Sequence, residues 1–188
     1  VLAYRTGWLK CHYPAAFMAA NLTNELTSTD GVPQYIAEAK RMGLNVLPPD
    51  INQSYSEFDA VDDKVIFAFR GMKGMGKEAA DAIVREREAN GHYKSFMDFL
   101  ERCLPIQEAL PEDREGRRIK KSIVNAKTVE VCIKTGAFDK LGLNRPTLLL
   151  NMQEAMKYVN DKNNGTDNGQ GDLFGGTDEK VYADFEFK

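Results

Sequence analysis

Apolar residues recur at helical spacing in the first part of the chain and at strand spacing soon after it. The helical period predicts three helices, over 1–12, 14–22 and 30–42. Residues 46–51 must then be extended, because the proline pair at 48–49 excludes a continuing helix. Polar and apolar residues alternate over 57–61 and 64–69, which predicts a β-hairpin around Asp62-Asp63.

The second predicted strand leads directly into a glycine turn, Gly74-Met75-Gly76. Two glycines one residue apart permit backbone angles that a Cβ atom would forbid. A short helix is expected before the turn and a longer one from Lys77, with a small residue at Ala80 that allows close helix packing. This pattern predicts a helix-hairpin-helix.

The predicted turn has the chemistry of a phosphate site. A helix that begins near Lys77 points its unpaired N–H groups at the turn, where they can bind an anion. The backbone of a nucleic acid is the expected partner, contacted without regard to sequence. The residues expected to bind DNA are Lys73, Gly74, Met75, Gly76 and Lys77. Glycine pairs also occur in many turns that bind nothing, and this simpler interpretation stays open.

Three further helices are predicted after the turn. Ser95 and Asp98 form a capping-box pattern at the start of a short helix, and Asn125 is expected to cap the next. A last helix opens at Asn144 with its apolar stripe in the core, and a second, degenerate hairpin is expected at 134–138. The charged segment 104–122 is expected to be an exposed loop, whose basic residues either face solvent or meet phosphates.

Composition limits the function. The 188 residues carry a net charge of −3, so any contact with nucleic acid must be local. Three cysteines without a CxxC pair favour a reducing, cytoplasmic setting and no metal site, and no apolar run suits a membrane. The chain lacks an initiating Met, and we interpret it as a fragment of a longer protein.

The composition changes after residue 160. Segment 161–169 is almost wholly polar and is expected to be disordered. It precedes the peptide 170–174, in which Leu173 and Phe174 are two large apolar residues between glycines. Such a pair suggests a peptide that docks on another protein. From spacing alone, folding back on this chain's own core is equally possible.

Several of these segments, in this order, resemble the alpha subunit of bacterial DNA polymerase III, a family C polymerase. The similar segments are Leu9–Ala20, Tyr35–Gly43, Val46–Asn52, the glycine turn, Lys134–Asp139 and Gln170–Phe174. The resemblance implies a mainly α-helical fold with one small β-hairpin and a disordered C-terminal tail. It divides the chain into the helical end of the fingers (1–52), the β-hairpin (53–70), a helix-hairpin-helix region (71–160) and a flexible tail with a clamp-binding peptide (161–188).

The same resemblance implies partners and activity. The hairpin would hold duplex primer-template DNA, and the sliding clamp would bind Gln170, Asp172, Leu173 and Phe174. Other replicase subunits are further expected partners. The catalytic carboxylates and their magnesium lie in the palm of family members, so this fragment is expected to be inactive and without a cofactor. The alternative is a stand-alone helix-hairpin-helix module for interaction or DNA repair, although the Pro-Val-Asp segment of base-excision glycosylases does not follow the turn.

Overall fold

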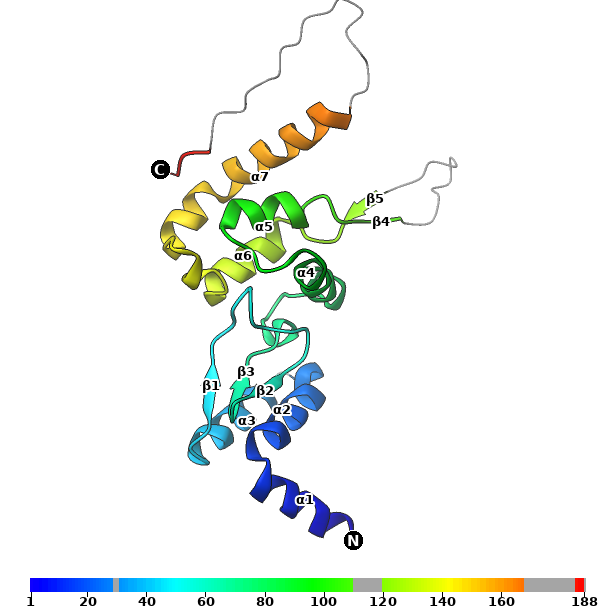
Figure 1. The fold of residues 1–188 in the computed structure, drawn as a ribbon, viewed down its shortest axis with the longest axis vertical. Helices are drawn as coiled ribbons and strands as arrows, with labels where there is room; N and C mark the ends of the chain where they lie inside the picture. Colours follow the sequence, from blue (N-terminus) through cyan, green and yellow to red (C-terminus); the bar gives the residue numbers. More distant parts are fainter. Residues whose placement is uncertain (29–30, 110–119, 168–184, 188) are drawn as a thin grey trace, which may run out of the picture.

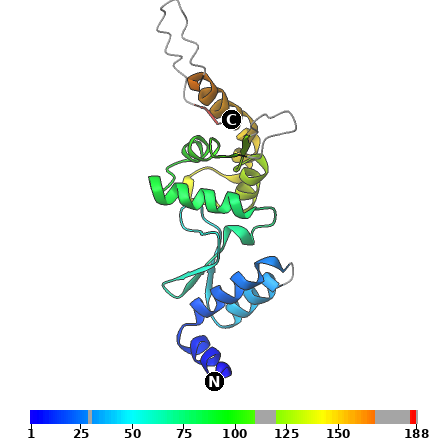
Figure 2. The ribbon, with the colours of Figure 1, turned by 90° about the vertical axis from the view of Figure 1, so that its right-hand side faces the viewer.

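The computed structural model describes residues 1–28, 31–109, 120–167 and 185–187, without the side chains of 109, 120 and 164–167. The described part is elongated, with an N-terminal unit at one end and a larger helical unit at the other (Figures 1 and 2). Its helices are α1 Leu2–His12, α2 Pro14–Asn24, α3 Gly31–Arg41, α4 Lys77–Asn90, α5 Phe96–Cys103, α6 Ala126–Thr135 and α7 Arg145–Asp167. The predicted mainly helical fold class is confirmed.

The N-terminal unit packs α2 and α3 against a small sheet in the order β1-β3-β2. Its strands are β1 Asn45–Leu47, β2 Asp59–Val61 and β3 Lys64–Ile66. Asp62 and Asp63 both adopt positive φ angles, 49° and 57°, so the predicted turn is a tight two-residue hairpin. The sequence pattern did not predict that β1 pairs with β3 in parallel, because this pairing depends on a crossover rather than on a local turn.

Helix α1 forms as predicted but lies outside the core. None of its residues is buried. Trp8 instead stacks on its helix neighbour His12, with ring centroids 4.5 Å apart. Its apolar spacing therefore correctly indicated a helix but not a buried face.

The larger unit buries its core between α4, α5, α6 and α7. The predicted caps are confirmed: the Ser95 hydroxyl accepts from the Asp98 amide at 3.1 Å, and the Asn125 side chain accepts from the Thr128 amide at 3.1 Å. Gly136 ends α6 in the left-handed conformation. The turn after it leads through a short 3-10 helix, Asp139–Leu141, into α7.

A loop at residues 50–54 joins the two units by inserting into the larger one. The Ile51 side chain belongs to the core of the larger unit, and its amide donates to the Ala137 carbonyl at 2.8 Å. Asn52 makes two hydrogen bonds to the backbone of Tyr93, at 2.9 and 2.8 Å. Lys140 pairs with the buried carboxylate of Asp50 at 2.8 Å. These contacts fix the larger unit to the chain that leaves the β1 strand.

The structure departs from the sequence predictions at two places. The ends of the charged segment 104–122 are not loop but form an antiparallel ribbon, β4 Gln107–Ala109 with β5 Lys120–Ser122. Helix α7 continues to Asp167, past the predicted boundary at residue 160. The extension packs beside α5, where Lys162 pairs with Glu101 at 2.7 Å, and such tertiary contact overrides poor helix propensity.

Two aromatic residues near the C-terminus return to the core of the larger unit. Phe187 lies 6.2 Å from the Phe96 ring, and Phe185 lies 5.8 Å from the Tyr158 ring. No sequence pattern predicted this packing. The predicted clamp-binding peptide at 170–174 lies outside the described residues.

A membrane span is absent from the described part of the chain, where every helix is too short or too polar to form one.

Candidate nucleic-acid interface

The glycine turn is anchored in the core of the larger unit by buried side chains. A short 3-10 helix, Phe69–Gly71, precedes it and passes into successive tight turns. The Met72 amide donates to the Phe69 carbonyl, and the Met75 amide donates to the Met72 carbonyl, each at 3.0 Å. The side chains of Phe69, Met72 and Met75 are all buried, so the turn is anchored to the core at three successive points.

The two glycines have different structural roles. Gly74 has a φ of +99°, a conformation that side chains rarely adopt, and a Cβ there would lie 3.3 Å from Val131 Cγ2 and 3.6 Å from Lys127 Cε. Gly76 has a φ of −80° and is the N-cap of α4. The sequence pattern permits such angles at both glycines, and the structure adopts one at Gly74 but not at Gly76. At Gly76 a Cβ would meet only Glu78 Oε2, at 3.7 Å.

The turn and the start of α4 leave several amides open. Within the described part of the chain, the N–H groups of Gly74, Gly76 and Lys77 donate to no acceptor, and all three residues are exposed. Met75 differs from the prediction, because its amide is already bonded to Met72 and its side chain is buried. Lys73 is exposed beside the turn. The start of α4 therefore presents open donors and flanking positive charge, which is the chemistry of an anion site.

Helix α4 is held firmly behind the turn. The face formed by Ala79, Ala80, Ile83 and Val84 is buried, and the predicted packing residue Ala80 is fully inaccessible. On the next turn, buried Arg87 donates to the carbonyl oxygens of Ile51 and Ser54 at 2.9 and 2.7 Å. The direction of α4, and so of its open amides, is fixed by the core and by the joining loop.

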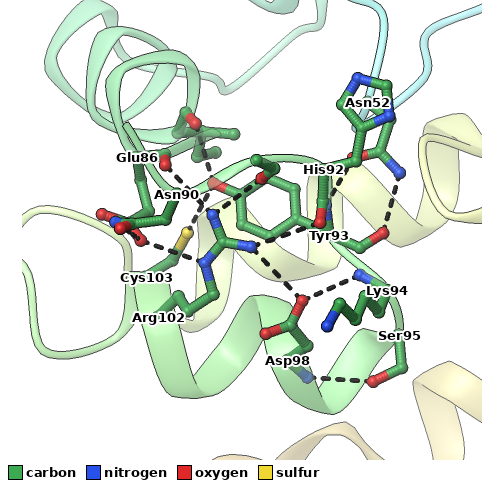
Figure 3. Close-up of polar contacts among 12 residues, drawn as sticks. Asn52, Glu86, Asn90, His92, Tyr93, Lys94, Ser95, Asp98, Arg102 and Cys103 are labelled. Atoms are coloured by element: carbon green, nitrogen blue, oxygen red, sulfur yellow. Dashed lines mark hydrogen bonds and ion pairs between the residues drawn. The ribbon is translucent and has the colours of Figure 1, made fainter. Parts of the chain in front are cut away.

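A polar network fixes the other end of α4 to α5 (Figure 3). Arg102 of α5 donates to the carbonyl oxygens of Glu86 and Gly91 at 3.1 and 2.9 Å, and it pairs with the Glu86 carboxylate at 3.1 Å. These bonds attach the last turn of α4 and the Gly91 residue that ends it to α5. The guanidinium also lies 4.4 Å from the centroid of the Tyr93 ring.

The centre of this network is neutral. The Tyr93 hydroxyl donates to the Ile83 carbonyl at 2.8 Å and lies 3.2 Å from Cys103 Sγ. Burial raises the pKa of Tyr93 well above its ordinary value and raises the pKa of Cys103 to about 12. Both groups stay protonated near neutral pH, so the network is structural rather than a reactive thiol site.

The structure brings two further lysines to the turn. Sequence reasoning missed Lys127, whereas Lys121 belongs to the charged segment whose basic residues were expected either to face solvent or to meet phosphates. Lys121 of β5 and Lys127 of α6 line the same groove as Gly74 and Gly76. Both are about 50 residues from the turn along the chain, so no local motif could have linked them to it. The predicted clamp-binding residues Gln170, Asp172, Leu173 and Phe174 lie in the segment that the structure does not describe.

The described residues contain no group of three or more His, Cys, Asp or Glu side chains that could hold a metal ion. Asp62 and Asp63 form the tip of the β-hairpin, and their positive φ angles are explained by the turn, in which Asp is a common residue.

Comparison with known proteins shows what this chain is similar to. Residues 43–110 match the family described as "Helix-hairpin-helix motif". The DNA polymerase III subunit alpha of Borreliella burgdorferi is 41% identical over 175 residues, which are 93% of this chain and 14% of that protein. The same subunit of Treponema pallidum is 36% identical over 100% of this chain, which is 15% of that protein. The subunit of Thermus aquaticus is 37% identical over 85% of this chain, which is 12% of that protein. This chain is thus homologous to a segment of about 15% of the DNA polymerase III alpha subunit, and the segment contains a helix-hairpin-helix motif.

Proposed function

We propose that this chain is the part of a replicative DNA polymerase that holds duplex DNA by its phosphate backbone. The observation that carries the proposal is the set of open, exposed amides of Gly74, Gly76 and Lys77 on a turn anchored in the core. A phosphate placed before α4 would accept from these amides, and Lys73 and Lys77 would add charge. The contact involves no base edges and is therefore independent of sequence.

The chain's low overall charge suits a contact of limited size. At a net charge of −3 the protein cannot coat DNA, and the binding energy must come from one patch. In a polymerase such a patch would hold the duplex that leaves the active site while the enzyme moves along it. The fragment is proposed to be inactive alone, with catalysis and magnesium in the remainder of the parent protein.

A second contact is proposed for the tail, on the resemblance of residues 170–174 to the clamp-binding peptide. Gln170 and Asp172 would make polar contacts, and Leu173 and Phe174 would fill an apolar pocket of the sliding clamp. Each of the two contacts can be weak, because DNA and clamp held together give a high effective concentration. The proposed division of the chain is therefore fingers remnant (1–52), β-hairpin (53–70), DNA-binding region (71–160) and clamp-binding tail (161–188).

Two binding assays test these contacts separately. In the first assay, a fluorescent primer-template duplex is titrated with the 188-residue chain in a salt series. The chain is expected to bind the duplex, and the affinity should fall when Lys73 and Lys77 are both changed to Gln. Two duplexes of unrelated sequence should bind equally. The Leu173→Ala, Phe174→Ala variant should lose clamp binding and keep DNA binding. A stand-alone interaction module would instead show clamp or protein binding with no affinity for DNA.

A further inference from the structure

A groove runs beside the glycine turn, between the start of α4, the start of α6 and the β4–β5 ribbon, which share one half of the molecule (Figure 1). Gly74 and Gly76 form one wall, where the missing side chains leave the backbone accessible. Lys127, Lys121, Glu78 and Glu108 also line the groove. The groove is thus continuous with the proposed phosphate site.

Lys127 is positioned by the fold rather than by chance on a free surface. The Asn125 cap fixes the start of α6, and the Lys127 side chain passes alongside the turn, with its Cε 3.6 Å from where a Gly74 Cβ would lie. A Cβ at Gly74 would be in ordinary van der Waals contact with this lysine stem, so the stem lies directly against the turn. Lys127 is exposed and has no acidic partner in the described part of the chain.

Lys121 completes the cationic side. It stands on β5 directly opposite Glu108 of β4, yet no ion pair joins them. With Lys73 and Lys77, four lysines therefore surround the turn, against the two carboxylates of Glu78 and Glu108. This local excess of positive charge contrasts with the net charge of −3 for the whole chain.

We infer that Lys127 and Lys121 bind the next phosphates of the DNA strand held by the turn, and that the Glu78 carboxylate weakens phosphate binding. The inference rests on the proposed function and extends its contact surface from α4 onto α6 and the ribbon. A DNA strand carries a phosphate about every 3.4 Å of helix axis, so a strand seated on the open amides must present further phosphates to the adjoining groove. Glu78 lies in the first turn of α4, where its carboxylate competes with phosphate for the same open donors.

Single charge changes test the inference through salt dependence. Lys127→Gln and Lys121→Gln should each reduce the slope of log affinity against log salt by about 0.9, since one phosphate contact is lost. Lys127→Arg should keep the slope, because it keeps the charge. Glu78→Gln should raise the affinity at low salt. The matched control is Lys157→Gln on α7, an exposed lysine outside the groove, which should leave the slope unchanged.

The outcomes separate this inference from the proposed function. If Lys73→Gln and Lys77→Gln weaken binding while the Lys127 and Lys121 variants behave like Lys157→Gln, the inference is overturned and the turn remains a DNA site. If the unaltered chain binds no duplex at low salt, both are overturned. Melting temperatures of all variants, expected within a few degrees of the original, exclude misfolding as the cause of any loss.

Discussion

Arg87 donates from one guanidinium nitrogen to the carbonyl oxygen of Ile51 at 2.9 Å, although the two residues are 36 positions apart. The same nitrogen also binds the Ser54 carbonyl, so a single buried cation holds the joining loop against the helix that follows the glycine turn. The helix that follows the glycine turn is consequently tied to the loop that joins the two units.

Replacing this arginine should destabilise the fold. Arg87→Met keeps an apolar stem but leaves two buried carbonyl groups without a donor, which costs roughly 1–3 kcal/mol for each unsatisfied group. Urea unfolding measures the loss. Arg85→Met is the control, because Arg85 is exposed on the same helix and should change the unfolding free energy by no more than about 0.5 kcal/mol. Equal effects of the two substitutions would contradict the assigned role.

The two glycines of the turn should respond differently to substitution. Gly74→Ala places a Cβ on a residue with a φ of +99° and 3.3 Å from Val131 Cγ2, so stability should fall by about 1–2 kcal/mol. Gly76→Ala has an ordinary φ of −80° and should cost less than 1 kcal/mol, as a weaker N-cap. Thermal unfolding of both variants decides the point. A larger loss at Gly76 would show that the turn is not built as described.

The three cysteines should differ in reactivity. Cys11 is exposed on α1, whereas Cys103 and Cys132 are buried. A thiol reagent at neutral pH should modify one cysteine in the native chain and all three in denaturant. Rapid native labelling of Cys103 or Cys132 would show that the core of the larger unit opens.

The buried thiols also predict a loss of stability at high pH. Burial raises the pKa of both Cys103 and Cys132 from an ordinary 9.0 to about 12. Between these values the unfolded chain releases the proton and the folded chain keeps it, so the free energy of unfolding falls as pH rises. The slope is at most about 1.4 kcal/mol per pH unit for each thiol. Denaturation of Cys132→Ala from pH 8 to 11 should show a shallower decline than the original chain, while Cys11→Ser should not.

Local chemistry decided which features were predictable from sequence. The Ser95 and Asn125 caps and the Asp62-Asp63 turn depend on residues within four positions of one another, and all three were correctly predicted. The glycine turn was also found, since its helix start and buried Ala80 follow directly in the chain.

Features that depend on distant residues were missed. The parallel pairing of β1 with β3, the Arg87 contact with Ile51 and the approach of Lys127 to Gly74 all join positions about 20 or more residues apart. The prediction that the Met75 amide is open was wrong, because this amide donates to the Met72 carbonyl. That bond depends on how the preceding 3-10 helix ends, which no sequence pattern indicated. Helical spacing in α1 could not show that the helix would be exposed, because apolar residues recur at the same period on a buried face and on an exposed one.

The most direct test of phosphate capture by the turn is duplex binding by Gly76→Ser. Serine is a favoured N-cap at this backbone geometry, and its hydroxyl would accept from the Glu78 or Ala79 amide at the start of α4, where the phosphate is proposed to bind. No charge changes, so electrostatic attraction to DNA is preserved. Fluorescence anisotropy with a primer-template duplex should show binding at least several-fold weaker than that of the original chain, with an unchanged or higher melting temperature. Binding equal to that of the original chain would contradict the account, because the amides before α4 would then play no part in holding DNA.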